Sequence, residues 1–183
     1  MIKVTMDTNC IIDLEEERES ACYIRELVLM HKRGRIELSV SAISASERKT
    51  NGKYASNFTE FQQMIRDVGL EDVKILKPPG IWDVTYWDWC TWGDEETEKL
   101  QRDIHQIMFP KIKFSYSEER NTKRWRNAKC DVLALCCHIR NEGDIFVTSN
   151  TKGFHQITKK PKLIALGAGQ ILYPKETISI LTE

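Results

Sequence analysis

The sequence lacks a long hydrophobic run, an excess of either charge and a paired-cysteine motif. No apolar stretch approaches the ~20 residues that a membrane-spanning helix needs. Lys3 and Asp7 interrupt the first apolar stretch, which does not fit a signal peptide. Basic and acidic side chains number 27 each, so bulk attraction to nucleic acid is not expected, although a local basic patch stays compatible. We therefore expect a cytoplasmic protein without a membrane partner.

The cysteines also argue against two kinds of site. None of the six has the C-x-x-C spacing of a zinc ribbon or a thioredoxin-like redox centre. Cys136 and Cys137 are adjacent inside an apolar run, as expected of buried side chains. The sequence therefore predicts free thiols in a reducing compartment, at Cys10, Cys22, Cys90, Cys130, Cys136 and Cys137.

Short apolar segments alternate with amphipathic ones along the 183 residues. The apolar segments predict strands at 2–6, 36–40, 73–76, 144–148 and 163–165. The amphipathic segments predict helices at 15–32, 58–68, 94–108, 126–139 and 174–181, with short helices after Asp7 and after Ser41. This alternation predicts one α/β domain over 1–183 with three layers (α/β/α), in which helices cover both faces of a central, mostly parallel sheet.

Residues 77–116 break this pattern. They contain prolines and a glycine and then four tryptophans, Trp82, Trp87, Trp89 and Trp92. We expect a tryptophan-rich helical insertion within the single domain. Such side chains usually pack against their own domain, but stacking on bases or binding a protein partner stays open.

Three carboxylates and one amide stand near the ends of the predicted strands. Asp7 follows the first strand, Glu47 lies one short helix beyond the second, Asp131 lies in the strongest apolar helix, and Asn150 follows the strand near 144–148. The ligand crevice of an open α/β sheet lies outside the carboxyl ends of its strands. Taken singly, Asp7 could cap a helix, and Glu47 and Asp131 could be surface residues. Taken together, they predict a shared pocket.

Carboxylates that converge in one pocket repel one another and raise each other's pKa. A hard divalent cation such as Mg²⁺ or Mn²⁺ removes this penalty and accepts oxygen ligands. A cation held in this way can lower the pKa of a bound water and neutralise charge on a phosphate. The pattern therefore favours metal-assisted hydrolysis of a phosphodiester.

These motifs resemble the PIN domain family of metal-dependent nucleases, over residues 1–50 and 125–176. VTMDTNCIID resembles the first motif, SVSAISASE the second, KCDVLALCC the third and IFVTSNTKGF the closing motif. The resemblance implies a PIN-like fold, Mg²⁺ or Mn²⁺ as cofactor, and Thr148 as a residue that orients a water or a carboxylate. It also implies a catalytic and metal-binding set, consisting of Asp7, Glu47, Asp131 and Asn150.

One position departs from the family pattern. Asn150 stands where the family usually has an aspartate. Its amide oxygen can still face a metal or a water, but the lost charge should weaken a second metal site more than the first. Other acidic residues lie nearby in the sequence without occupying the motif position, namely Asp13, Glu15, Glu16 and Asp144.

A basic segment leads directly into Asp131. The stretch RNTKRWRNAK could contact phosphates through its cations and stack an unpaired base on its tryptophan. The alternative is a solvated loop that the tryptophan anchors to the core. The predicted nucleic-acid contacts are Arg120, Lys123, Arg124, Trp125, Arg126 and Lys129.

These observations predict a metal-dependent endonuclease acting most readily on RNA, with the role of a toxin in a toxin–antitoxin pair among the options. The expected partners are RNA and an antitoxin or other protein, and homodimer formation stays open. The alternative is a catalytically weak PIN-like module that binds RNA or protein, which Asn150 favours slightly. A phosphatase-like hydrolase with a nucleophilic aspartate fits less well, because that chemistry usually needs D-x-D and Asn9 is not acidic.

Overall fold

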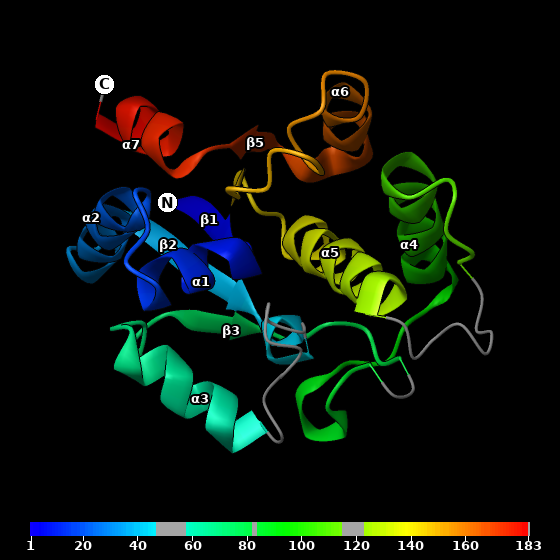
Figure 1. The fold of residues 1–183 in the computed structure, drawn as a ribbon, viewed down its shortest axis with the longest axis horizontal. Coiled ribbons are helices and arrows are strands. Elements are labelled where there is room, and N and C mark those ends of the chain that lie inside the picture. Colours follow the sequence, from blue (N-terminus) through cyan, green and yellow to red (C-terminus); the bar gives the residue numbers. More distant parts are fainter. Residues whose placement is uncertain (47–57, 82–83, 115–122, 183) are drawn as a thin grey trace.

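The computed structural model describes residues 1–46, 58–81, 84–114 and 123–182, and its strands form one parallel sheet. The sheet order is β3-β2-β1-β4-β5 (Figure 1). In the centre of the sheet, Val4 of β1 pairs with Leu38 of β2 on one side and with Ile145 of β4 on the other. The strands are β1 (Ile2–Met6), β2 (Ile36–Ser41), β3 (Lys74–Leu76), β4 (Ile145–Val147) and β5 (Gln170–Leu172).

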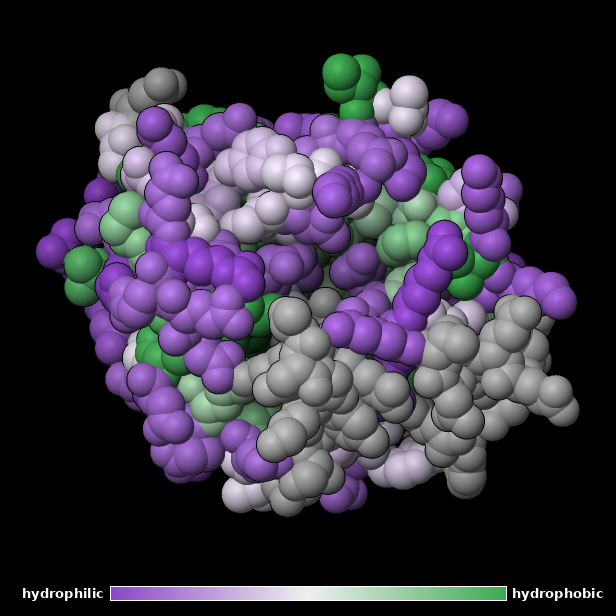
Figure 2. Space-filling view, viewed as in Figure 1, coloured by the Kyte–Doolittle hydropathy of each residue, from purple (hydrophilic) through white to green (hydrophobic). Residues whose placement is uncertain are grey.

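Helices cover both faces of this sheet, so the predicted three-layer α/β/α class is confirmed. Alternate strand residues enter different core clusters: Val147 joins the first and Phe146 the second. The first cluster includes side chains of α1 (Thr8–Glu15), α2 (Ala21–Lys32), α3 (Phe58–Asp67) and α7 (Pro174–Thr182). The second includes side chains of α4 (Glu95–Met108), α5 (Lys123–Arg140) and α6 (Lys160–Leu163). The side of the molecule shown in Figure 2 has a largely hydrophilic surface.

The predicted helix over 15–32 is wrong in its first residues. Helix α1 ends at Glu15, and α2 begins only at Ala21. Between them Glu17 adopts a φ of 50°, in the left-handed region, which a continuous right-handed helix cannot contain. The amphipathic pattern identified the helix correctly, but this turn separates it from α1.

The strand predicted at 163–165 is also wrong. Leu163 ends α6, and the residues after it form the π-helical turn η4 (Ile164–Ala168). The fifth strand lies further along, at β5. Gly169 connects the two, with a φ of 56°, and a Cβ there would lie 2.3 Å from the carbonyl oxygen of Asp144. A residue with positive φ interrupts a strand, and the close backbone approach fits only glycine. The strand therefore begins after Gly169 rather than before it.

The tryptophan-rich region joins both layers. Its longest helix, α4, packs beside α5 (Figure 1). Before it, the ring of Trp89 in the 3₁₀ turn η2 (Trp87–Trp89) stacks on Phe58 of α3, with ring centroids 4.1 Å apart. Trp92 differs, because 91% of its surface is exposed. Within the described ranges, no helix combines the length and the hydropathy needed to cross a membrane.

Candidate active site

The strand order predicts a ligand crevice between β1 and β4, at their carboxyl ends. The chain passes from β1 to β2 and β3 on one side, and β4 and β5 add on the other side. Such a reversal of strand order is where open α/β sheets bind ligands. Asp7 directly follows β1 and Thr148 directly follows β4. The Asp7 amide donates to the carbonyl oxygen of Val147 at 2.9 Å, which holds the two strand ends together.

Asp7 is buried, and three donors fix its carboxylate. Its Oδ1 accepts from the backbone amide of Thr8 at 2.8 Å, so Asp7 caps α1. Its Oδ2 accepts from the Asn9 amide at 2.9 Å and from the Thr148 hydroxyl at 2.7 Å. Two carboxylate oxygens offer about four lone-pair positions. The described residues use three of them, and they leave one position on Oδ1 for a cation or a water.

The pKa of Asp7 is raised above its ordinary value. Burial is the main cause, because only 1% of the residue is exposed. The hydrogen bonds from Thr148, Asn9 and Thr8 oppose this effect, and the charge of Asp13 adds to it. A positive charge beside Asp7 would therefore relieve an existing electrostatic cost.

Asp13 is a second buried carboxylate, one turn and a half further along α1. Its Oδ1 accepts from Arg18 at 3.2 Å, and its Oδ2 accepts from the hydroxyls of Ser20 and of Ser149, the latter at 2.6 Å. Thr148 and Ser149 thus bond one buried carboxylate each. Because Arg18 and two hydroxyls already satisfy Asp13, it serves best as a residue that holds the segment after β4 in place.

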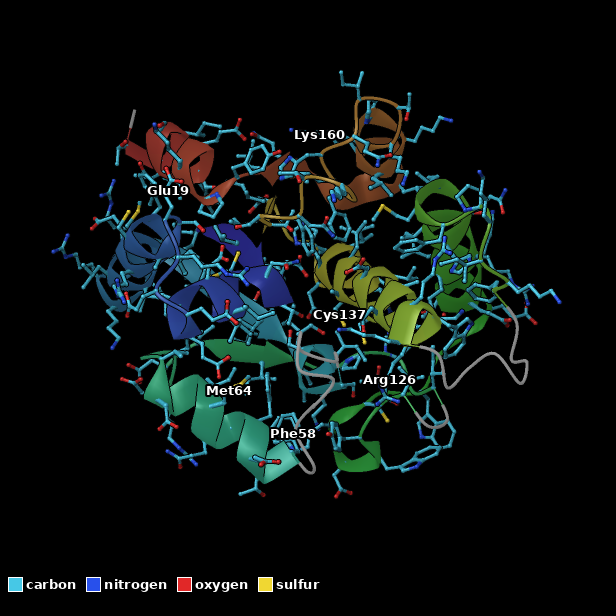
Figure 3. All side chains as sticks on the ribbon, viewed as in Figure 1. Glu19, Phe58, Met64, Arg126, Cys137 and Lys160 are labelled. Carbon is cyan, nitrogen blue, oxygen red and sulfur yellow. The ribbon has the colours of Figure 1, made fainter. Side chains whose placement is uncertain are left out.

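Helix α5 brings Asp131 to the same edge of the sheet. Figure 3 labels Arg126 and Cys137 of this helix. The Ser41 hydroxyl, at the end of β2, contacts Cys137 Sγ at 3.3 Å, and Arg126 Nε donates to the carbonyl oxygen of Ser46 at 2.8 Å. The helix therefore runs from the 3₁₀ turn η1 (Ala42–Ser46) back along the sheet, and Asp131 lies between the two contacts. It shares a helix face with His138, two turns away, whose ring contacts Thr5 of β1 at 2.9 Å.

Asn150 lies in the loop after β4, and its amide oxygen is already bonded. Asn150 Oδ1 accepts from the backbone amide of Gly153 at 2.9 Å. A Cβ at Gly153 would lie 2.7 Å from Asn150 Nδ2, so the turn needs glycine there. His155 Nε2 donates to the carbonyl oxygen of Thr148 at 2.9 Å and stacks on Tyr173. These contacts fix the loop beside Asp7.

Two predicted site residues, Glu47 and Arg120, lie outside the described residues. Within the described part of the chain, no three side chains of histidine, cysteine, aspartate or glutamate are grouped closely enough to hold a metal ion. The described oxygen donors at this edge are Asp7, Asp131 and Asn150. Oxygen donors of this kind suit Mg²⁺ or Mn²⁺, and Glu47 would be needed as the third carboxylate.

The basic segment differs from its prediction in two residues. Trp125 is only 4% exposed, and its Nε1 donates to the carbonyl oxygen of Lys113, so its ring is not presented to a base. Lys129 is also buried and lies on the face of α5 that meets α4. Neither residue therefore offers the exposed contact predicted for it, and Trp125 instead fits the alternative in which the tryptophan anchors this segment to the core. Lys123 and Arg124 are exposed at the start of α5.

Sequence reasoning missed two parts of the site. Asn9 was considered as a motif residue, a possible helix cap and a non-acidic residue, but not as the donor that its amide provides to Asp7. Ser44 was not singled out, yet its hydroxyl accepts from the Thr8 hydroxyl at 2.8 Å and ties η1 to α1. Asn9 lies two residues after Asp7, within reach of a capping carboxylate, and this local spacing could have identified it. The bond to Ser44 joins residues 36 positions apart and has no local signal.

Comparison with protein families gave no match, because no family model fits the chain. A comparison with curated proteins likewise found none that is significantly similar. The PIN-like assignment therefore stays a prediction from the sequence motifs.

Proposed function

We propose that the chain is an Mg²⁺- or Mn²⁺-dependent endonuclease that hydrolyses phosphodiester bonds in RNA. The observation that supports this most is Asp7, a buried carboxylate at the reversal of strand order, fixed by three donors and with a raised pKa. A structural cap alone needs neither the burial nor the bond from β4. Perturbed carboxylates in a crevice are typical of functional sites.

Each residue has a defined task in this proposal. Thr148 and Asn9 hold the Asp7 carboxylate in one orientation, so that its open position on Oδ1 faces a cation. Asp131 and Glu47 complete the oxygen donor set. A bound divalent cation supplies a water of lowered pKa and neutralises charge on the scissile phosphate. Lys123 and Arg124, exposed at the start of α5, contact phosphates along the strand.

The test is a cleavage assay on RNA and on single-stranded DNA, with Mg²⁺, with Mn²⁺ and with EDTA. We expect cleavage of RNA that needs either metal, and a loss of at least roughly 100-fold in rate for Asp7→Asn, which removes a charge from the donor set. Asp88→Asn is the matched control, because Asp88 is exposed and lies in η2, outside the crevice. Wild-type cleavage that persists in EDTA would remove the metal from the proposal.

A second candidate function is RNA binding without efficient cleavage. The observation that favours it is Asn150, which is uncharged and whose oxygen is bonded to Gly153. This candidate predicts binding of RNA by the wild-type chain with little cleavage at any metal concentration. The Asn150→Asp variant separates the two candidates, because a new carboxylate should increase cleavage at low Mn²⁺ if position 150 faces the metal. Unchanged cleavage in that variant would place Asn150 outside the donor set.

A further inference from the structure

A cleft of about 700 Å³ lies between α4 and α5, away from the crevice at the strand ends. A volume of this size is in the range of small-molecule binding sites. Lys129 lines it from α5, and Lys129 and Asp131 lie two positions apart, so they are separated by roughly 200° around the helix. The cleft therefore opens on the face of α5 opposite to Asp131, and it is a separate site from the candidate active site.

The cleft contains a buried cation that has no carboxylate partner among the described residues. Lys129 is 3% exposed, and its ammonium lies 3.4 Å from the centroid of the Phe114 ring. The guanidinium of Arg102 approaches the same ring at 5.3 Å. No described carboxylate forms an ion pair with Lys129, whereas Arg102 bonds Glu98. Two like charges held against one ring repel each other, and an anion between them would be attracted by both.

The cleft also presents an amide and an aromatic face. Gln101 is 6% exposed and lines the cleft, and its side chain has no hydrogen-bond partner among the described residues. Trp92 lines the same cleft and is 91% exposed. The loop carrying Trp92 is fixed by two backbone bonds of its neighbour Thr91, to Pro78 and Gly80, each 2.8 Å long. An unbonded amide at Gln101 and an exposed ring at Trp92 both point to an organic ligand.

We infer that the cleft between α4 and α5 binds a nucleoside monophosphate unit. The phosphate would contact Lys129 and Arg102, which supply the positive charge. The base would stack on Trp92, because base–aromatic stacking needs only an accessible ring face. The Gln101 amide offers one donor side and one acceptor side, which suits the edge of adenine. The carboxylates of Glu95 and Glu98, which also line the cleft, can accept from ribose hydroxyls.

The cations, the Gln101 amide and the Trp92 ring together favour a nucleotide over simpler ligands of the same charge. Inorganic phosphate would use the cations but would leave Gln101 and Trp92 without a partner. A nucleoside without phosphate would leave Lys129 uncompensated. The same unit could come from a free mononucleotide or from the end of an RNA strand, and both present the same phosphate, ribose and base. The inference does not depend on the proposed nuclease activity.

The test measures binding by isothermal titration calorimetry in EDTA, with AMP, a 5′-phosphorylated triadenylate, adenosine and inorganic phosphate. We expect saturable binding of AMP or of the triadenylate, at least tenfold tighter than of adenosine or phosphate. If AMP binds as tightly as the triadenylate, the source is a free nucleotide; if only the triadenylate binds, the source is an RNA end. Because AMP has no internal phosphodiester and EDTA removes metals, failure here is distinct from failure of the nuclease proposal.

Two variants test the assigned contacts. Lys129→Gln keeps a long polar side chain without the charge and should weaken binding about tenfold or more, and Trp92→Ala should weaken it roughly fivefold or more through lost stacking. Lys99→Gln is the control, because Lys99 is an exposed cation of α4 that does not line the cleft. Absence of saturable binding by every probe, or equal affinities of the wild type and Lys129→Gln, would overturn the inference.

Discussion

One buried charged residue is central to each of the two proposed sites. Asp7 and Lys129 are both almost fully buried, and burial shifts both toward the neutral form. It raises the pKa of Asp7 and lowers the pKa of Lys129 to about 8. Hydrogen bonds compensate part of the cost at Asp7, and among the described residues the rings of Phe114 and Trp125 face Lys129. A ligand of the opposite charge would stabilise either residue, which links both proposals to the same physical cause.

Asp7→Asn should stabilise the protein at neutral pH. Asparagine caps a helix as well as aspartate does. The oxygen of the new amide can keep the hydrogen bond from the Thr8 amide. Its NH₂ can donate to the Thr148 hydroxyl and, once the Asn9 amide has rotated, to the Asn9 side-chain oxygen. The variant removes a buried negative charge, so we expect its free energy of unfolding at pH 7 to exceed that of the wild type by about 1 kcal/mol. Urea unfolding of both proteins in EDTA measures this difference.

The stability difference between the wild type and Asp7→Asn should depend on pH in a defined direction. A carboxyl group whose folded pKa is raised takes up its proton more readily in the folded state. Wild-type stability therefore gains from Asp7 as pH falls through the folded pKa, and the gain ends below the ordinary value of 3.8. The advantage of Asp7→Asn should shrink as pH is lowered from 8 toward 4. An advantage that is constant across this range would mean that Asp7 has no raised pKa.

The residues of the sites were only partly predictable from the sequence. Asp7 was recognisable because a carboxylate that ends an apolar strand is a local pattern. The burial of Trp125 was predicted only as the alternative to base stacking, and the burial of Lys129 was not predicted, because their segment reads as basic and solvated. Their positions depend on α4 and Phe114, which approach from an insertion with no local sequence relation to α5. Local pattern thus identified the strand-end carboxylate and missed the cleft.

At the scale of elements, α5 is the helix that connects the sheet with the second layer. His138, near its end, is fully buried and bonds both neighbours: Nδ1 accepts from the Thr5 hydroxyl, and Nε2 donates to the carbonyl oxygen of Ala168 at 3.0 Å. Because a carbonyl can only accept, the proton of the neutral ring is on Nε2. This contact fixes α5 against β1 and so sets where Asp131 lies.

His138 should make the protein sensitive to acid. Burial lowers its pKa to about 4 from an ordinary value of 6.5. The folded state therefore resists protonation, and stability is lost as pH falls from about 6.5 toward 4. The expected loss from this residue is about 3 kcal/mol, since one pKa unit corresponds to ~1.4 kcal/mol. The sign is opposite to that of Asp7.

The matched variant is His138→Gln, which keeps a donor for Ala168 and an acceptor for Thr5 but does not titrate. Unfolding free energies of the two proteins between pH 7.5 and 4 should diverge, with the wild type falling relative to the variant. Parallel curves would show that the pKa of His138 is not lowered in the folded state.

The elements themselves followed the sequence closely where periodicity and capping agreed. Helix α4 begins after Asp94, whose carboxylate accepts from the Thr97 amide at 2.8 Å, as its acidic start indicates. Periodicity failed at β5, where Leu163 has the apolar character of a strand residue but is a buried helix residue. Gly167 and Gly169, both with positive φ, determine the change of direction there. The apolar residues before and after these glycines look alike in the sequence, so their pattern cannot show which of the two segments pairs with the sheet.

At the scale of the whole molecule, the layered class was predictable and the strand order was not. Alternating strands and helices require a parallel sheet covered on both faces. The order β3-β2-β1-β4-β5 depends on which pairs of strands bury the most surface, as in the pairing of Val4 with both Leu38 and Ile145. The polar residues after the predicted strands indicated that strand ends should meet at one edge of the sheet, and Asp7 and Thr148 lie at the adjacent ends of β1 and β4.

The whole chain should unfold in one cooperative step, including the tryptophan-rich region. That region touches both core clusters: Trp89 stacks on Phe58 in the first layer, and Ile104 and Met108 of α4 pack in the second. Loss of either layer would expose one face of the same sheet, so neither cluster has a stable state without the other. Four of the five tryptophans lie in this region and the fifth, Trp125, lies in α5, so fluorescence reports mainly on this region, while far-UV circular dichroism reports on helices throughout the chain. Urea transitions followed by the two signals should share one midpoint and one m value. A fluorescence transition at lower urea than the dichroism transition would show that the insertion unfolds separately, and the chain would then contain two units of stability instead of one.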